Sequence, residues 1–243
     1  MPSVSNFLPP AEMCSSAGSW FSLFIHGLRP SGGIVRAHAG VTGSGVRPYE
    51  LLEHASADRA RVENFISQRF HESFGSRVEA FMPRLFSLRD PQGNICGAFG
   101  LRSASRRLFL EQYLDVPIER AIADRTGHRA ERRTIVEVGH FSGTVPGAMR
   151  IMIRLLTERL HHEGFEWVAF TGTTGLRNAF GRMGLPLSDI QAADRERLPA
   201  TERAAWGSYY DHDPRIVVGH VRQGYEALMQ RASPPAPGQG ERP

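Results

Sequence analysis

The sequence contains no lysine, so all 29 of its Lys and Arg residues are arginine. A chain without lysine cannot form a Schiff base or use a side-chain amine as a nucleophile. It also cannot carry the phosphate loop GxxxxGK[ST], which requires a lysine. Arginine nevertheless suits phosphate and carboxylate partners, because its planar guanidinium group binds them bidentately. A GC-rich coding sequence would produce the same bias, so the bias alone identifies no ligand.

Cysteine is scarce and long apolar runs are absent. Cys14 and Cys96 do not suggest a disulfide framework, and with scattered histidines they do not form a zinc spacing. No apolar run reaches the roughly 18 residues of a membrane-spanning helix. The apolar cluster at 20–28 has no basic segment before it, because the first arginine is Arg29. We therefore expect a cytoplasmic protein with no membrane span, no metal, no tightly bound cofactor and no nucleic-acid partner.

The length of 243 residues suits one sizeable domain with tails. Residues 1–45 are rich in Ser, Gly and Pro and are predicted to form a flexible leader, either with or without a short docking element at 20–28. Residues 232–243 have the composition of a disordered tail. Residues 46–231 are therefore predicted to form a single domain.

Apolar spacing together with cap and turn residues predicts the elements of this domain. In chain order they are a helix capped by Ser56 or Asp58, a β-hairpin at 83–103 around DPQGN, a helix from near Pro117, a strand at 133–141, a long helix that ends before Gly164, a strand at 167–173, a short helix from a Thr cap to Gly184, a strand at 215–221 and a final helix. An antiparallel opening thus precedes a strand–helix–strand unit, which predicts an α/β (α+β) fold. No GxGxxG follows the first strand, so a doubly wound nucleotide fold is not predicted.

Glu137 lies in the middle of the otherwise apolar stretch TIVEVGHFSG, residues 134–143. Burial would raise the pKa of its carboxyl group, which suits a general base that takes a proton from an amine near neutral pH. The alternative is an ion pair with Arg102 or another buried arginine. Strand alternation places His140 on the opposite face, unless Gly139 forms a bulge. His140 is therefore either a partner in proton transfer or a core or surface histidine.

The turn SGTVPGA follows this strand and leads into a helix. Such a turn presents several backbone N–H groups and the positive end of a helix dipole, which together suit a phosphate or pyrophosphate. Gly143 and Gly147 allow close approach of a ligand to the backbone. The alternative is an ordinary strand-to-helix loop.

A strand, a Gly-containing turn, a long amphipathic helix, a second strand and the helix LRNAFGRMGL together resemble the core of the GNAT acyltransferase superfamily. The resemblance implies that the two strands splay, that a thioester carrier lies in the gap, and that the turn amides hold its pyrophosphate. It assigns carrier binding to Phe141, Ser142, Gly143, Gly147, Thr171 and Asn178, with the amides of residues 141–143 at the thioester carbonyl. Asn178 is alternatively a helix-surface residue. The turn departs from the usual Q/R-x-x-G-x-G/A, which leaves both acyl-CoA and an acyl carrier protein open as co-substrate.

A set of motifs in fixed order resembles the bacterial thermostable hemolysin family: RLFSLRDPQGNICGAFGLRSA, LFLEQYLDVPIE, IVEVGHFS, WVAFTGT, LRNAFGRMGLP and WGSYYDHDPRIVVGHV. The first half also resembles acyl-homoserine lactone synthases, through Gly97 with Arg102 and through their E-x-S-R-F motif. Glu137 and Phe141 fit that motif, whereas Gly139 and His140 stand where the synthases have Ser and Arg. No counterpart exists for the paired acids of their adenosyl substrate, so lactone synthesis is not predicted.

Several further residues are candidates for the site. Tyr209 and Tyr210 in WGSYYDHDP are candidate general acids for the leaving thiolate, or packing residues. Arg102 and Glu111 are assigned to substrate binding, with a structural partnership as the alternative for Arg102. Arg106 and Arg107 form either a solvated patch or a docking surface for an acidic carrier protein.

These features predict an acyltransferase that moves an acyl group from a thioester carrier, acyl-CoA or acyl carrier protein, to an amine or similar small nucleophile. Direct attack on the thioester agrees with the absence of a GxSxG motif or a poised cysteine. Two alternatives stay open. One is a membrane-active cytolysin, as the family name implies, although no amphipathic membrane helix or pore strand is predicted. The other is a catalytically inactive GNAT-like binding module.

Overall fold

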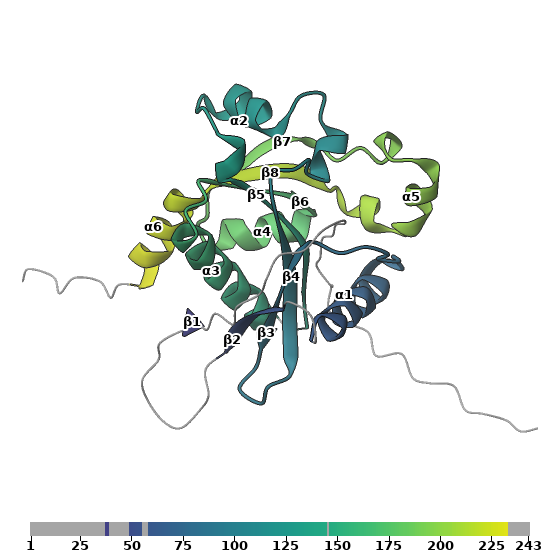
Figure 1. The fold of residues 1–243 in the computed structure, drawn as a ribbon, viewed down its shortest axis with the longest axis vertical. Coiled ribbons are helices and arrows are strands. Elements are labelled where there is room, and N and C mark those ends of the chain that lie inside the picture. Colours follow the sequence, from purple (N-terminus) through teal and green to yellow (C-terminus); the bar gives the residue numbers. More distant parts are fainter. Residues whose placement is uncertain (1–36, 39–48, 55–57, 145, 233–243) are drawn as a thin grey trace, which may run out of the picture.

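The computed structural model describes residues 37–38, 49–54, 58–144 and 146–232. Within these ranges the chain forms one eight-stranded mixed sheet flanked by six α-helices (Figure 1). The strands are β1 (Ala37–His38), β2 (Glu50–His54), β3 (Arg84–Arg89), β4 (Ile95–Ser103), β5 (Ile135–Gly143), β6 (Trp167–Gly172), β7 (Ser188–Ala192) and β8 (Arg215–His220). The helices are α1 (Arg59–Phe74), α2 (Ile118–Thr126), α3 (Pro146–His162), α4 (Thr174–Arg182), α5 (Ala200–Ala205) and α6 (Val221–Ala232). The predicted mixed α/β fold is confirmed.

The sheet order is β1-β2-β3-β4-β5-β6-β8-β7. Strands β1 to β5 are antiparallel neighbours, and β8 is antiparallel to both β6 and β7. Only the pairing of β5 with β6 is parallel among the described strands. This pair is the strand–helix–strand unit predicted from the sequence, because α3 connects its two strands.

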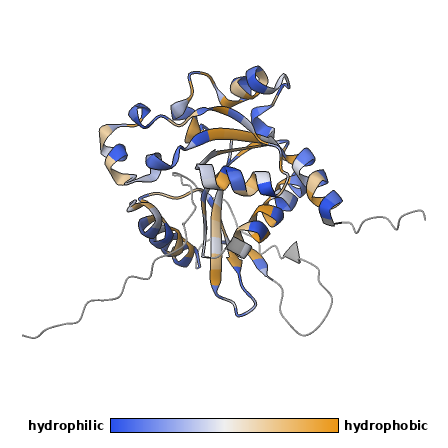
Figure 2. Ribbon diagram, turned by 180° about the vertical axis from the view of Figure 1, so that it is seen from behind, coloured by the Kyte–Doolittle hydropathy of each residue, from blue (hydrophilic) through white to orange (hydrophobic). Residues whose placement is uncertain are grey.

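Helices α1 and α3 cover opposite faces of the central strands (Figure 1). Two glycines of β4, Gly97 and Gly100, leave room for the layers on the two sides of the sheet. Because they are three residues apart, their Cα hydrogens that replace a side chain face opposite sides. A Cβ at Gly97 would lie 2.4 Å from Sδ of Met152 in α3, and one at Gly100 would lie 2.4 Å from Cβ of Met82, which follows α1. Apolar residues are concentrated along the strands between these layers (Figure 2). The core is therefore a sandwich of helix, sheet and helix.

Local signals located the hairpin and the long helix correctly. In the DPQGN turn, Oδ1 of Asp90 accepts hydrogen bonds from the backbone N–H groups of Gln92 and Asn94, both at 2.9 Å. Gly164 adopts φ +77° just after α3, as a helix-ending glycine does. The predicted N-cap position of Asp58 is confirmed, and Ser56, the other candidate, lies outside the described residues. Asp58 occupies the N-cap position of α1 without a side-chain capping bond, and the N-cap of α4 is Thr173, also without one.

Several elements were not predicted. The predicted strand at 133–141 begins two residues later, because Arg132–Thr134 form a 3₁₀ turn, and it continues to Gly143. Strand β7 and helix α5 lie after Pro186, in a stretch for which no element was predicted, and β2 precedes α1. Strand β1 pairs with β2 and lies within the predicted leader. Ala232, the first residue of the predicted tail 232–243, ends α6. The cluster at 20–28, Cys14 and residues 233–243 lie outside the described residues.

Candidate functional site

Strands β5 and β6 part in the middle of the sheet. Their register pairs run from Ile135 and Trp167 to Glu137 and Ala169, and then stop. Both strands continue beyond this point, β5 to Gly143 and β6 to Gly172. The β6-facing edge of residues 138–143 therefore has no partner strand within the described part of the chain, and Glu137 sits where the two strands separate.

A β-bulge lies just beyond Glu137. Strand β4 pairs Gly100 with Gly139 and Ala98 with Ser142, so His140 and Phe141 together stand opposite one residue. His140 has φ +55°, a left-handed conformation that is uncommon for a residue with a side chain. The bulge shifts the alternation by one residue, so His140 and Glu137 lie on the same face of the sheet. The predicted placement of His140 on the opposite face from Glu137 is therefore wrong. A bulge accounts for the difference, but His140 and Phe141 form it, whereas Gly139 keeps its regular partner Gly100.

Glu137 is a fully buried carboxylate that the backbone holds in place. Glu137 is only 2% exposed to solvent. Oε2 accepts a hydrogen bond from the N–H of Phe109 at 2.9 Å, and Oε1 accepts one from the N–H of Leu110 at 3.0 Å. Burial raises the pKa of Glu137 to about 7, although nearby Arg102 and the two N–H groups act to lower it. The carboxyl group is therefore poised to gain or lose a proton near neutral pH.

Arg102 lies directly opposite Glu137 in the β4–β5 register and is also buried. Burial lowers the pKa of the Arg102 guanidinium, and the charge of Glu137 opposes that effect. The two residues thus influence each other electrostatically. The two interpretations of Glu137, as an acid–base group and as a partner of Arg102, are compatible in one arrangement.

His140 is held as a neutral acceptor. Its Nε2 accepts a hydrogen bond from the N–H of Met82 at 2.9 Å, and its ring lies 5.4 Å from that of Phe81. Burial, together with the charges of Arg102 and Arg59, lowers the pKa of His140 to about 3. With its Nε2 lone pair occupied, this imidazole is poorly placed to accept a proton. The geometry favours the core interpretation of His140.

Three tyrosines, Tyr113, Tyr209 and Tyr210, form a cluster, and Tyr113 lies within electrostatic reach of Glu137. The hydroxyl of Tyr209 donates to the carbonyl oxygen of Thr171 at 3.4 Å, and the hydroxyls of Tyr113 and Tyr210 are 2.7 Å apart. Burial raises the pKa of Tyr113, as do Tyr210, Tyr209 and Glu137, so each of these three groups lies within electrostatic reach of Tyr113. Tyr113 was not identified from the sequence, because LFLEQYLD offers no signal that separates it from a packing residue.

Glu111 is saturated by structural contacts. Its carboxylate accepts hydrogen bonds from the N–H groups of Leu108, at 2.8 Å, and Ile118, at 3.0 Å. It also forms a bidentate ion pair with Arg132, with N–O distances of 2.6 and 3.0 Å. Burial alone would raise the pKa of Glu111, but these partners hold it below the usual value. The contacts favour a structural role over the predicted substrate binding.

The candidate carrier-binding residues are distributed around the parting of the strands. Phe141 stacks on Phe99 in the core, and the Ser142 hydroxyl lies 3.5 Å from the carbonyl oxygen of Ala98. Gly147 is exposed in the first turn of α3, and no atom lies within 4 Å of a Cβ built on it. Asn178 is exposed on α4.

One buried threonine near the end of β6 was not among the site residues predicted from the sequence. Thr173, which follows β6, is 2% exposed, and its hydroxyl has no hydrogen-bond partner within the described part of the chain. Thr171, which was predicted, is buried two residues before it. The only sequence signal was the run of threonines in TGTTG.

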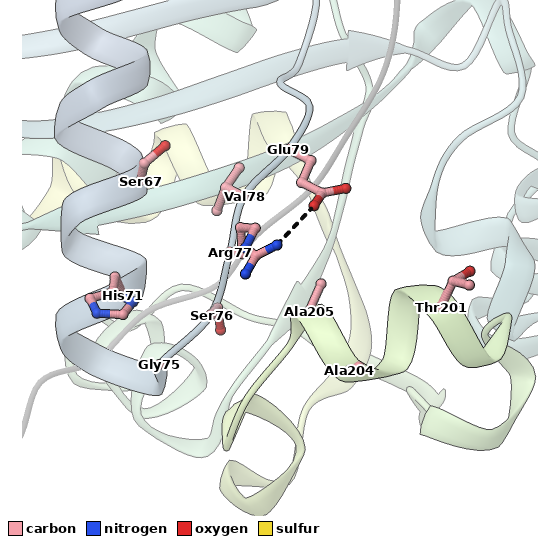
Figure 3. Close-up of a pocket in the computed structure, with 10 residues that line it drawn as sticks. All are labelled: Ser67, His71, Gly75, Ser76, Arg77, Val78, Glu79, Thr201, Ala204 and Ala205. Atoms are coloured by element: carbon pink, nitrogen blue, oxygen red, sulfur yellow. Dashed lines mark ion pairs between the residues drawn. The ribbon is translucent and has the colours of Figure 1, made fainter.

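A separate pocket of about 420 Å³ opens between the C-terminal half of α1, the segment that follows it, and α5 (Figure 3). Its polar lining includes Ser67, His71, Thr201 and the ion pair of Arg77 with Glu79, at 3.9 Å. No candidate residue from the sequence lines it. Trp206 connects this pocket to the three tyrosines. Its carbonyl oxygen accepts a hydrogen bond from the hydroxyl of Ser76 in the pocket wall, and its ring lies 5.5 Å from that of Tyr209.

The described residues contain neither a membrane-spanning helix nor a metal-binding cluster. No helix in these ranges is both long enough and apolar enough to cross a membrane. Nor do these residues hold a group of three or more His, Cys, Asp or Glu side chains that could bind a metal ion.

Comparison with known proteins gives one family and several related folds. Residues 52–225 match the family model described as thermostable hemolysin, and no curated protein matches the chain. Solved structures with the same fold include TofI in an apo form, at 16% identity and a TM-score of 0.52, covering 74% of this chain and 95% of that one. The AHL synthase LasI aligns at 11% identity and a TM-score of 0.51, covering 75% and 94%. FeeM, an N-acyl amino acid synthase from uncultured soil microbes, aligns at 10% identity and a TM-score of 0.52, covering 76% and 96%. At these identities the structural likeness establishes the fold alone.

Proposed function

The chain belongs to the thermostable hemolysin family, and we propose that it is an acyltransferase that moves an acyl group from a thioester carrier to an amine or similar small nucleophile. One observation carries the proposal: a buried carboxyl group with a pKa of about 7 sits where β5 and β6 part. Two proteins that share the fold are named as synthases of acylated products: LasI as an AHL synthase and FeeM as an N-acyl amino acid synthase. These names agree with the proposed reaction class.

We assign the role of general base to Glu137. The lone pair of the acceptor amine attacks the thioester carbonyl carbon, and Glu137 takes the proton that the nitrogen then releases. The tetrahedral intermediate collapses by breaking the carbon–sulfur bond, and the leaving thiolate gains a proton. A pKa near 7 leaves about half of the carboxyl groups ionised at neutral pH, which suits a group that must accept a proton and then return it.

The thioester is proposed to lie along the free edge of β5. Backbone N–H groups of residues 138–143 that face β6 have no partner strand there within the described residues, and donors of this kind stabilise a developing oxyanion. Gly147 in the first turn of α3 would sit close to the phosphate groups of the carrier, and the open space around it agrees with that role. Thr171, Thr173 and Asn178 would contact the carrier from β6 and α4.

The tyrosines and His140 are proposed to position the site rather than to transfer protons. A phenol whose pKa is raised by burial is a weaker acid than a free tyrosine, and so a poor proton donor to a thiolate of pKa about 8.5. Protonated Glu137 is the better donor. The Tyr113–Tyr210 hydrogen bond would instead fix the 3₁₀ turn Leu110–Tyr113, whose first N–H holds Glu137.

The decisive experiment measures binding and transfer directly. Isothermal titration calorimetry with acyl-CoAs and with acyl carrier proteins is expected to show saturable binding of one carrier class, followed by acyl transfer to an amine acceptor detected by mass spectrometry. If purified protein binds neither carrier class and instead releases dye from liposomes, the cytolysin alternative replaces this proposal. A cytoplasmic location is part of the proposal and is tested by fractionation of the producing cell.

A further inference from the structure

A second hollow of about 430 Å³ lies on the surface between the segment that follows β4 and the start of α2. Three arginines line it, Arg106, Arg107 and Arg132, together with the carboxylates Glu111 and Asp115. The neutral part of its lining includes Val116, which is 40% exposed and is the sole exposed large hydrophobic residue in the described ranges. None of these features has a part in the proposed acyl transfer.

Arg132 forms a rigid floor of the hollow. Its Nε donates to the carbonyl oxygen of Ala104 at 2.8 Å, and its terminal nitrogens donate to Glu111, Glu119 and the carbonyl oxygen of Arg106. These five bonds use all five N–H donors of the guanidinium group. Arg132 therefore has no donor left for a ligand, but it fixes the backbone on which Arg106 stands.

The remaining charges leave two guanidinium groups uncompensated. Arg132 shares its single positive charge between Glu111 and Glu119, and Asp115 pairs with Arg197 at 2.8 Å. Arg106 and Arg107 are exposed, and within the described residues their side chains form no ion pair or hydrogen bond. Two adjacent arginines on a fixed backbone provide forked donors suited to a carboxylate or a phosphate.

From this arrangement we propose that the hollow binds a small anion, a carboxylate or phosphate monoester that carries a short apolar group. Arg106 and Arg107 hold the anionic group, and Val116 contacts the apolar part. The volume falls within the range of small-molecule pockets. A protein partner is disfavoured, because a stable protein interface buries about 800 Å² on each side and one exposed valine supplies little apolar surface for it.

The site lies next to the buried carboxylate. Arg107 lines the hollow, and Phe109, two residues later, donates its N–H to Glu137. The N–H of Leu108 between them is fixed by Glu111. Occupancy of the hollow is therefore expected to be visible in the backbone amide signals of residues 106–110.

The test uses inorganic phosphate, butyrate and the neutral analogue butyramide, titrated into the full chain at low salt and followed by NMR of backbone amides. Saturable binding of phosphate and butyrate is expected, with dissociation constants on the order of 1 mM, and no saturation by butyramide. The double variant Arg106→Gln/Arg107→Gln should weaken both anions at least about tenfold. Val116→Ser should weaken butyrate but leave phosphate unchanged.

The matched control is Arg61→Gln/Arg182→Gln, which removes two exposed arginines outside the hollow and changes the net charge equally. It should leave both affinities within about twofold of the wild type. An equal loss in both double variants would mean general charge attraction and would overturn the site. Failure of the wild type to bind either anion saturably, or equal binding of butyramide, would overturn it as well. None of these readouts depends on acyl transfer.

Discussion

At the scale of single residues, Glu137 is the position where burial, charge and backbone geometry converge. Burial raises its pKa to about 7. Two backbone N–H groups orient its carboxylate. Because these donors are neutral, they hold the carboxylate in place without neutralising its charge. This arrangement holds the carboxyl group in place while leaving it able to change protonation state.

The first prediction concerns this residue. Glu137→Gln should lower kcat/KM for acyl transfer by roughly 10² to 10⁴-fold, because an amide cannot accept the proton of the attacking amine. In the wild type, kcat/KM should rise with pH through about 7, since only the ionised carboxylate acts as a base. The variant should lose this step. Steady-state kinetics between about pH 5.5 and 9 provide the measurement, and a variant that keeps both the rate and the step would remove Glu137 from the mechanism.

His140 leads to the opposite expectation. His140→Ala should lower the free energy of unfolding by about 1–3 kcal/mol, because the buried N–H of Met82 loses its acceptor. The midpoint of the pH–rate profile should stay where it is in the wild type, since a neutral histidine takes no part in the titration. Urea unfolding and the same kinetic series check this. A shifted or vanished midpoint in a folded variant would return His140 to the proton-transfer step.

At the scale of elements, the parting of β5 from β6 and the first turn of α3 define the proposed carrier site. Gly147 tests it, because its surroundings leave room for a side chain. Gly147→Ala should keep or slightly raise the stability, by up to about 1 kcal/mol, since alanine restricts the unfolded chain. It should nevertheless raise KM for the thioester several-fold, because the added methyl group stands where the phosphates would approach the backbone.

The matched control for this prediction is Gly181→Ala in α4, where a Cβ would likewise have nothing within 4 Å. Thermal melting should give it a similar stability to Gly147→Ala, while its KM stays unchanged. Equal KM values in the two variants would place the carrier phosphates elsewhere.

The same scale explains which elements could be predicted from the sequence. The DPQGN hairpin and α3 carry their signals within a few residues, as turn and helix-end residues that act locally. The bulge at His140 depends on the register with β4 and on the N–H of Met82, 58 residues away. Tyr113 acquires its partner Tyr210 from 97 residues away. Neither feature leaves a local pattern in the sequence. The sheet face on which His140 lies, and the place of Tyr113 in the tyrosine cluster, could therefore be seen only in the folded structure.

For the whole molecule, two buried groups on one sheet face give opposite contributions to the pH dependence of stability. The pKa of Glu137 rises from 4.5 to about 7 on folding, so the folded state binds more protons than the unfolded chain between these values. Stability from this group is complete below pH 4.5 and is lost as the pH rises to about 7. The pKa of His140 falls from 6.5 to about 3, so its contribution is complete above pH 6.5 and is lost as the pH falls toward 3.

Between pH 4.5 and 6.5 the contributions of Glu137 and His140 therefore have equal and opposite slopes and cancel each other. The slope of the wild type in this window comes from other groups, among them His54 and His220, whose pKa values burial also lowers. Each single variant should uncover the slope of the group that remains, about 1.4 kcal/mol per pH unit. Relative to the wild type, Glu137→Gln should gain stability as the pH rises through this window and His140→Ala should lose it, by about 3 kcal/mol in each case. Urea unfolding measured at intervals across the window provides the curves.

The double variant tests whether the two groups act as one electrostatic unit. Arg102 lies within electrostatic reach of both residues, because its charge lowers the pKa of Glu137 and of His140. Removing both titrating groups should restore the wild-type slope between pH 4.5 and 6.5, but the loss of stability should depart from the sum of the single effects, since the two sites share this guanidinium. Strict additivity at every pH would mean that Glu137 and His140 titrate independently, each responding to Arg102 and to its own burial but not to the other residue.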